Sequence, residues 1–114
     1  MAFLDFGPDD RPADAVFLHA NGFNALTYRH VLAPLATHFR ILAIDQRGRG
    51  GTSLETVVEG RPDWLDLRDD LLAFLDALEL THVVLSGRSW APRPPSARPP
   101  WRPRAAVASC CSIR

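Results

Sequence analysis

The fold is decided by residues 40–51, which read RILAIDQRGRGG. The apolar run Arg40–Asp45 predicts a short buried strand. The glycine-rich stretch Arg47–Gly51 ends that strand, because glycine permits the tight turn that must follow. The elements on either side of this stretch then define the fold class.

Two further strands and two helices are predicted around it. Ala15–His19 and His82–Ser86 are short apolar runs that indicate buried strands. Thr27–Thr37 has apolar residues at helical spacing, although Pro34 within it implies a kink. A longer helix begins near Pro62, and its apolar face includes Leu67, Leu71, Phe74, Leu75 and Leu78. Strands that alternate with helices indicate crossover connections, so we predict an α/β fold with a parallel sheet and flanking helices.

The composition is typical of one soluble domain. The chain has 114 residues, 46% hydrophobic and 23% charged, which suffices for one core and is too short for two domains. Its 13 basic and 13 acidic residues balance, so neither nucleic acid nor a membrane surface is an expected partner. No stretch approaches the ~20 apolar residues of a membrane span, and Met1–Asp5 does not resemble a signal peptide. The adjacent Cys110 and Cys111 do not suggest a disulfide framework, and we expect a cytoplasmic protein.

The charges are segregated, and the character of the chain changes after Ser89. All 13 acidic residues lie at or before Glu79, and every basic residue is an arginine. Residues 90–114 hold six of the ten prolines and five of the 13 arginines, with no helical or strand periodicity. We therefore assign residues 1–89 to part of one folded domain. The Arg/Pro-rich tail, residues 90–114, would be disordered as written.

Gly87, Arg88 and Ser89 follow directly after the predicted strand His82–Ser86. A serine in a sharp strand-to-helix turn holds its hydroxyl at the carboxyl end of the sheet, where a base and a substrate can reach it. Glycines two positions before and after the serine keep side chains out of such a turn. Gly87 meets this requirement, whereas Ala91 takes the second position. Taken alone, Gly-x-Ser also fits an ordinary turn.

Two other loops follow predicted strands. His19–Phe23 has small residues that let a backbone N–H point into a site and stabilise a developing oxyanion. The same residues also fit a plain loop with a packed histidine. Asp45–Ser53 is glycine-rich but lacks the Gly-Lys-Ser/Thr ending of a phosphate-binding loop, so we interpret it as structural scaffolding beside the site.

In this order and spacing, the three loops resemble the α/β-hydrolase family over residues 15–89. Members show His-Gly-x-x, Asp-x-Arg-Gly-x-Gly-x-Ser and Gly-x-Ser-x-Gly, each after a strand, and the middle motif is the most specific. The resemblance is carried by His19, Gly22, Asp45, Arg47, Gly48, Gly50, Ser53 and Gly87. It implies that Ser89 is the nucleophile and that the backbone N–H groups of Asn21 and Trp90 bind the oxyanion. Ala20 replaces the usual glycine, and Arg88 stands where the family often has histidine.

The resemblance also implies a reaction. The parent enzyme would hydrolyse an ester, thioester or similar acyl bond of a small molecule through an acyl-enzyme on Ser89, with no metal or organic cofactor. The serine needs a histidine base and an acid, which in this family follow it in the chain. No Asp, Glu or His follows Ser89, so we expect this chain alone to be inactive. Epoxide hydrolases and haloalkane dehalogenases share the fold but use an aspartate nucleophile, and Ser89 argues against both.

The tail has the composition of a GC-rich gene read out of frame. Family members often continue Ser-Met-Gly-Ala, and loss of the first A from ATG-GGC-GCC leaves TGG-GCG-CC. The shifted codons read Trp-Ala-Pro, as at Trp90–Pro92. Shifting the codons of Ala108–Arg114 likewise allows a sequence of the type Leu-Val-Leu-Phe-Asp-Pro, which looks like the family's next strand. We therefore predict a one-nucleotide deletion at codon 90.

Two non-enzymatic interpretations stay open. Pro92–Pro95 and Pro100–Pro103 have the Pro-x-x-Pro spacing that docks on aromatic grooves in a polyproline conformation. The five arginines of the tail could also attract nucleic acid, which would make the chain an interaction protein. The other interpretation is a pseudo-hydrolase that keeps the fold without turnover.

Overall fold

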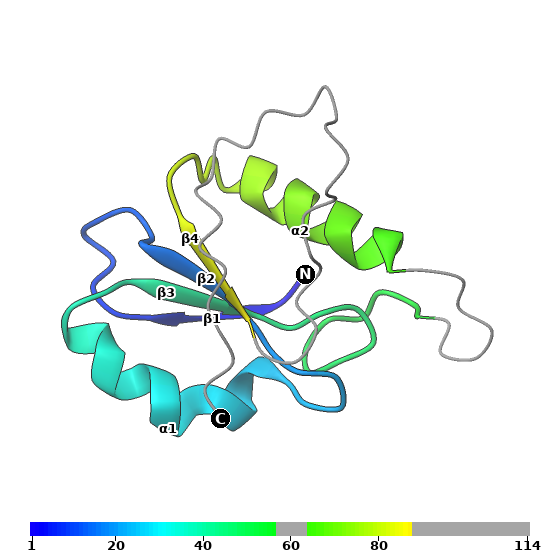
Figure 1. Ribbon diagram of the computed structural model, residues 1–114, viewed down its shortest axis with the longest axis horizontal. Coiled ribbons are helices and arrows are strands. Elements are labelled where there is room, and N and C mark those ends of the chain that lie inside the picture. The colour runs from blue at the N-terminus through cyan, green and yellow to red at the C-terminus, as the bar shows by residue number, and fades with distance from the viewer. Residues whose placement is uncertain (57–63, 88–114) are drawn as a thin grey trace.

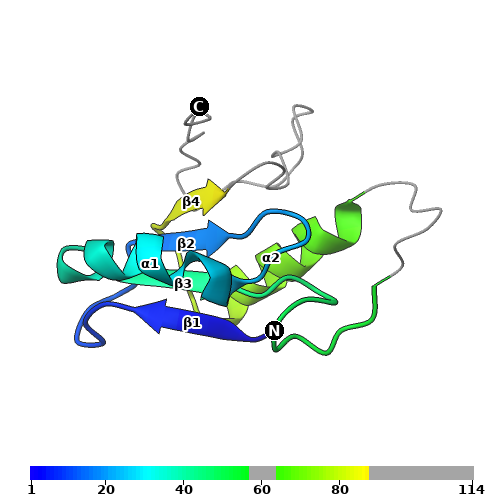
Figure 2. The same cartoon turned by 90° about the horizontal axis from the view of Figure 1, so that it is seen from below.

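A four-stranded sheet forms the centre of the protein, whose computed structural model describes residues 1–56 and 64–87. Across the sheet the strand order is β1-β3-β2-β4, as Figure 2 shows. The strands are β1 (Phe3–Phe6), β2 (Ala15–Leu18), β3 (Ile41–Ile44) and β4 (Val84–Gly87). Strand β2 is parallel to both β3 and β4, whereas β1 is antiparallel to β3. The predicted α/β class is confirmed, and the sheet is mostly parallel.

The three predicted strands are all present, with ends that differ by one or two residues. Strand β1 was not predicted, and it adds an antiparallel edge strand to three strands that are parallel as predicted. Its four residues, Phe-Leu-Asp-Phe, alternate between exposed and half-buried positions at the edge of the sheet. So short an edge strand lacks the continuous apolar run that indicates a buried one.

Helices cover both faces of the sheet, and Figure 1 shows the sheet between them. Helix α2 (Leu65–Ala77) lies on one face. On the other face lie three short helical pieces, η1 (Ala25–Tyr28), α1 (Arg29–Leu32) and η2 (Ala33–Thr37). The single helix predicted over Thr27–Thr37 is thus divided. Pro34 sits at the start of η2, where its missing N–H removes the hydrogen bond that would continue α1.

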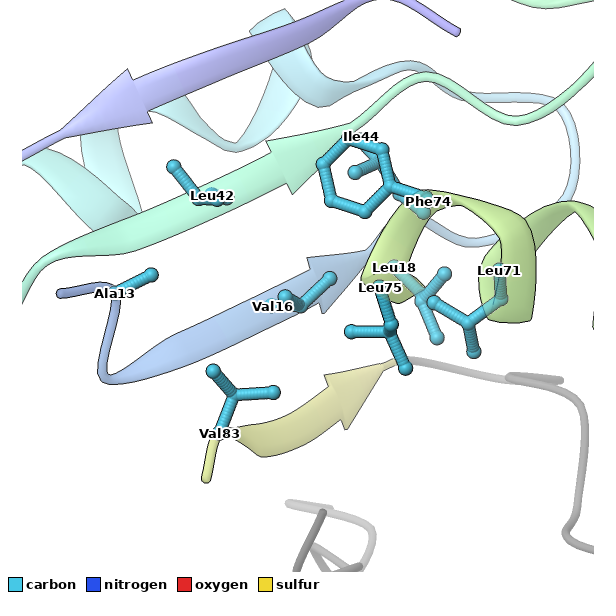
Figure 3. Close-up of a cluster of buried hydrophobic side chains, with 9 residues drawn as sticks. All are labelled: Ala13, Val16, Leu18, Leu42, Ile44, Leu71, Phe74, Leu75 and Val83. Carbon is cyan, nitrogen blue, oxygen red and sulfur yellow. The ribbon is translucent and has the colours of Figure 1, made fainter. Parts of the chain in front are cut away.

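Alternate residues of the strands form two cores, one on each face, as expected for side chains that point to opposite sides of a sheet. The core under α2 is drawn in Figure 3 and contains Ala13, Val16, Leu18, Leu42, Ile44, Leu71, Phe74, Leu75 and Val83. The core on the opposite face contains Ala25, Leu32, Ile41 and Ala43. Strand β3 is buried on both faces, as its sequence predicts.

One residue of the predicted helix face is misassigned. Leu78 is 41% exposed because α2 ends at Ala77, and the chain turns away before Leu78 reaches the core. The position of Pro62 and the predicted disorder of residues 90–114 lie outside the described residues. In the part of the chain that the structure describes, no helix is long and apolar enough to cross a membrane.

Candidate active site

The carboxyl ends of the three parallel strands meet at one edge of the sheet. In the register, Leu18 of β2 lies beside Ile44 of β3 and beside Gly87 of β4. The loops that begin at His19 and Asp45 therefore leave the sheet at the edge where β4 ends. This edge is where ligands bind in open α/β sheets. Ser89, the predicted nucleophile, is two residues beyond Gly87 and, like Trp90, lies outside the described residues.

His19 is buried at this edge, with 2% of its surface exposed. Its Nε2 atom accepts a hydrogen bond from the backbone N–H of Gln46 at 3.1 Å, and its Nδ1 atom lies 2.9 Å from the carbonyl oxygen of Ala20. The Gln46 side chain donates in return to the His19 carbonyl oxygen at 3.1 Å. His19 is thus a packed histidine, one of the two interpretations of this loop, and it joins the loops after β2 and β3.

The loop after β2 turns immediately beyond His19. The backbone N–H of Phe23 donates to the Ala20 carbonyl oxygen at 3.1 Å, and Gly22 between them has a φ of 84° that favours glycine. Asn21 is exposed, and its Oδ1 accepts a hydrogen bond from Arg49 at 3.2 Å. Within residues 1–56 and 64–87, no acceptor pairs with the backbone N–H of Asn21.

Asp45 organises the second loop through its carboxylate. Oδ1 accepts the backbone N–H of Ala25 at 2.7 Å, and Oδ2 accepts that of Gly51 at 2.9 Å. The Thr52 hydroxyl donates to the Asp45 carbonyl oxygen at 2.6 Å. A buried carboxylate that is occupied by backbone donors fixes loops rather than transferring protons. This geometry agrees with the interpretation of Asp45–Ser53 as scaffolding.

The glycines of the same loop are needed where the chain passes close to other groups. Gly50 has a φ of 52°, and a Cβ atom there would collide with the Asp45 carboxylate. Gly48 has a φ of 69°, and a Cβ atom there would collide with the Thr56 side chain. Ser53 is exposed at the end of this loop, and Gly87 closes β4.

Arg47 ties the loop after β3 to helix α2. Its Nε and Nη2 atoms donate to the two oxygens of the Asp70 carboxylate, each at 2.7 Å, and Nη1 donates to the Glu55 carbonyl oxygen at 3.2 Å. These bonds to Asp70 raise the pKa of the Arg47 guanidinium above its ordinary value, although partial burial opposes the shift. Arg47 is therefore structural, at the margin of the candidate site.

Sequence reasoning missed three residues of this site: Tyr28, Gln46 and Arg49. The Tyr28 hydroxyl accepts the backbone N–H of Ala20 at 3.3 Å, and the other two residues contact His19 and Asn21. Gln46 and Arg49 occupy the variable positions of the Asp-x-Arg-Gly-x-Gly motif, so the motif itself gave no signal for them. Among the described residues, no group of three His, Cys, Asp or Glu side chains is placed to hold a metal ion.

Comparison with known proteins assigns the class. The model of the alpha/beta hydrolase family matches residues 15–112, and the chain belongs to this family. The match therefore extends beyond Ser89 into the Arg/Pro-rich tail. It is consistent with the mostly parallel sheet and with the loops at its carboxyl edge.

Two curated relatives are both hydrolases. The chain is 34% identical over 94 residues to a haloalkane dehalogenase of Agrobacterium fabrum, an alignment that covers 73% of this chain and 29% of the relative. It is 37% identical over 82 residues to epoxide hydrolase A of Mycobacterium tuberculosis, covering 69% of this chain and 25% of the relative. The chain thus spans less than a third of the length of either relative.

Solved structures give the same fold. A haloalkane dehalogenase loop variant from Bradyrhizobium elkanii superposes with a TM-score of 0.65 at 25% identity, covering 77% of this chain and 28% of that one. An epoxide hydrolase from metagenomes of hot environments superposes with a TM-score of 0.61 at 32% identity, covering 77% and 29%. An esterase from a marine microorganism, 19% identical with a TM-score of 0.62 and coverage of 74% and 30%, supports the fold alone.

Proposed function

We propose that this chain is part of a serine hydrolase in which Ser89 attacks the carbonyl carbon of an ester, thioester or similar acyl substrate. The observation that carries the proposal is the strand register. Because Leu18 and Gly87 are neighbours in adjacent strands, the loop His19–Phe23 and the chain leading to Ser89 begin side by side. An oxyanion-binding N–H from the first loop and a nucleophile after β4 require this arrangement.

The proposed reaction follows the resemblance to serine members of the family. The Ser89 hydroxyl oxygen bonds to the carbonyl carbon while a histidine base takes its proton, and the carbonyl oxygen becomes an oxyanion. The backbone N–H groups of Asn21 and Trp90 donate to this oxyanion. Its collapse expels the alcohol or thiol, which takes the proton from the histidine, and water then hydrolyses the acyl-enzyme. The base and the acid are not found after Ser89, so we propose that the 114-residue chain does not turn over substrate.

A second candidate function is hydrolysis of a carbon–halogen bond or an epoxide. The identities of 34% to a haloalkane dehalogenase and 37% to an epoxide hydrolase favour it. Against it stands the residue at position 89, because enzymes of these two kinds use an aspartate carboxylate as nucleophile. Ser89 cannot form the carboxylate ester through which an aspartate nucleophile acts, so we prefer the acyl substrate.

We further propose that residues 90–114 are encoded out of frame. The residues Trp90–Pro92, which a shifted reading of the family's Met-Gly-Ala codons would give, support this proposal. The family match runs to residue 112 and favours the competing proposal that the tail belongs to the domain. Resequencing the DNA from the Gly87 codon through several hundred bases downstream decides between them. An added base that restores Ser-Met-Gly and opens a frame with a later acid and histidine supports the shift. A frame that closes as written overturns it and makes the tail a candidate binding segment.

The frame-restored protein tests the chemistry. We expect it to hydrolyse p-nitrophenyl esters, and we expect Ser89→Ala to lower kcat at least about a thousandfold, since the nucleophile is then absent. Ser53→Ala, which alters an exposed serine of the neighbouring loop, is the matched control and should keep the activity. Halide release from a bromoalkane without ester turnover would overturn the proposal in favour of the second candidate. Ester turnover by the 114-residue chain itself, abolished by Ser89→Ala, would overturn the proposed inactivity.

A further inference from the structure

We propose that His19 is a positioning residue for the oxyanion-binding N–H of Asn21. In this proposal His19 is a neutral Nδ1–H tautomer fixed by Gln46, and it holds the peptide between Ala20 and Asn21 in one orientation. Its catalytic meaning rests on the proposed serine hydrolase function, whereas the tautomer and the orientation of the peptide do not.

The tautomer follows from the partners of the two ring nitrogens. The backbone N–H of Gln46 can only donate, so Nε2 of His19, at 3.1 Å, must accept and carry no proton. The Ala20 carbonyl oxygen can only accept, so Nδ1, at 2.9 Å, must donate. Both partners are backbone groups and the ring is buried, so a second tautomer or a charged ring would leave a buried donor facing another donor.

The hydrogen bond to Ala20 acts on Asn21 because one peptide unit contains both groups. The Ala20 carbonyl and the Asn21 N–H lie in the same plane and point in opposite directions across a trans peptide bond. A donor that holds the carbonyl oxygen therefore aims the N–H away from His19. The backbone N–H of Phe23 donates to the same oxygen at 3.1 Å, so two donors fix the plane. Hydrogen bonds to the carbonyl also polarise the peptide and strengthen its N–H as a donor.

Gln46 completes the connection from the other side. Its side chain donates to the His19 carbonyl oxygen at 3.1 Å while its backbone N–H donates to the His19 ring. The two bonds make His19 and Gln46 a reciprocal pair, one residue from each loop. The side chain of Asn21 is held separately by Arg49 at 3.2 Å. The loop after β3 thus holds the loop after β2 through the side chains of Gln46 and Arg49.

The first test is ¹⁵N NMR of the 114-residue chain labelled with ¹⁵N at histidine. The chemical shifts of the ring nitrogens report which of them carries a proton. We expect the His19 signals at neutral pH to show a protonated Nδ1 and an unprotonated Nε2. The same shifts are readable from a sedimented sample by magic-angle spinning if the chain self-associates. A protonated Nε2 on His19, or a charged ring, would overturn the proposal.

Two conservative variants separate the two halves of the proposal. The Asn side chain places an amide N–H near Nδ1, and the Gln side chain places an amide oxygen near Nε2. We expect His19→Asn to keep the backbone N–H resonance of Asn21 and to shift that of Gln46. His19→Gln should keep the backbone N–H resonance of Gln46 and shift that of Asn21. A resonance of Asn21 that does not move in His19→Gln would contradict the positioning role.

The Gln46→Leu variant covers the case in which both His19 variants fail to fold. It removes only the side-chain bond, so the His19 tautomer should persist while the Phe23 N–H, which donates to the same Ala20 oxygen, exchanges faster with solvent. A Phe23 exchange rate equal to that of the wild type would contradict the role of Gln46.

In the frame-restored enzyme, His19→Gln should lower kcat about ten- to a hundredfold with KM little changed, because the donor is misdirected rather than removed. An unchanged kcat would overturn the catalytic part of the proposal. The protonation of the His19 ring and the Asn21 N–H resonance do not depend on serine chemistry. Failure of the proposed function and failure of the positioning role therefore give different experimental results.

Discussion

Asp45 holds two distant stretches of backbone with one carboxylate. Its oxygens accept the N–H groups of Ala25 and Gly51, while its carbonyl oxygen accepts the Thr52 hydroxyl. Thr52 in turn accepts the backbone N–H of Ala2 at 2.9 Å, so β1 is tied to the same loop. Each of these donors needs the carboxylate or the hydroxyl in one position. Any group that displaces the Asp45 side chain therefore loosens several loops at once.

Gly50 is the residue on which this arrangement depends most. Gly50→Ala should lower the free energy of unfolding by about 3 kcal/mol, because it adds backbone strain at a φ of 52° and a collision with the Asp45 carboxylate. Gly22→Ala is the control, since its φ of 84° is also strained but nothing lies within 4 Å of the added Cβ. It should cost about 1–2 kcal/mol. Urea unfolding of both variants measures the difference, and equal losses would contradict the steric argument.

Asp14 should make the fold sensitive to acid. The hydrogen bond from the backbone N–H of Arg40, at 2.7 Å, lowers the pKa of its carboxyl, and the Arg11 guanidinium contributes in the same direction. Because the pKa is lower in the folded state, ionised Asp14 stabilises the fold above the carboxyl's ordinary pKa. This stabilisation is lost as the pH falls through the lower pKa of the folded protein.

The Asp14→Asn variant tests this dependence. It should be less stable than the wild type at pH 7, by at most about 1 kcal/mol since the Asp14 side chain is 35% exposed. The gap should narrow as the pH falls below about 4. Asp76→Asn, at an exposed position of α2, is the control. Thermal unfolding at a series of pH values makes the comparison, and a gap that does not change with pH would contradict the assignment.

At the scale of elements, Arg47 fixes α2 against the loop after β3, through Asp70 at 2.7 Å and Asp66 at 3.6 Å. Asp70 is 14% exposed and receives two hydrogen bonds from Arg47, so Asp70→Asn should cost about 2 kcal/mol by breaking this two-point contact. Asp66, whose Oδ2 lies 3.6 Å from Arg47 Nε, then remains as the weaker charge partner. Asp69→Asn is the matched control, because Asp69 is 62% exposed and, among the described residues, pairs with its neighbour Arg68. It should cost less than about 0.5 kcal/mol. Chemical denaturation measures both, and a similar loss in the two variants would show that the pair does not hold the helix.

Strand β3 and helix α2 were predictable because each carries a complete local pattern. Residues 41–44 are apolar throughout, and α2 shows its buried face at helical spacing, so burial alone identifies them. Strand β1 and the division of the Thr27–Thr37 helix depend on other parts of the chain. The first needs β3 as a partner, and the second combines Pro34 with packing on the sheet. Local sequence does not contain these contacts.

The candidate site divides in the same way. Asp45, Gly48 and Gly50 could be assigned from their motif, because a turn with positive φ and a carboxylate acceptor is a local device. The pairing of His19 with Gln46 and of Asn21 with Arg49 joins residues 27 and 28 positions apart. Such pairs exist only after β2 and β3 lie side by side, so the sequence pattern gave no indication of them.

At the scale of the molecule, β4 is an edge strand within residues 1–56 and 64–87. Its four residues include no charge and no proline, and Val84 is 43% exposed, so it lacks the features that keep an edge from pairing with another chain. We expect the 114-residue chain to self-associate and Val84→Lys to sediment as a smaller species. Val31→Lys on α1, which is 64% exposed, is the control and should not change the sedimentation. Equal effects of the two variants would point to general solubility rather than to the edge.

The strand order also has a consequence for synthesis on the ribosome. Strands β1 and β2 follow one another in the chain, yet β3 lies between them in the sheet. Residues 1–40 therefore contain two strands, and neither has its neighbour β3 until residues 41–44 leave the exit tunnel. The emergence of Ile41–Ile44 then creates two ladders together, one antiparallel to β1 and one parallel to β2. A nascent chain held before this point therefore has none of these ladders, and any pairing of β1 directly with β2 would have to break before β3 could take its place between them.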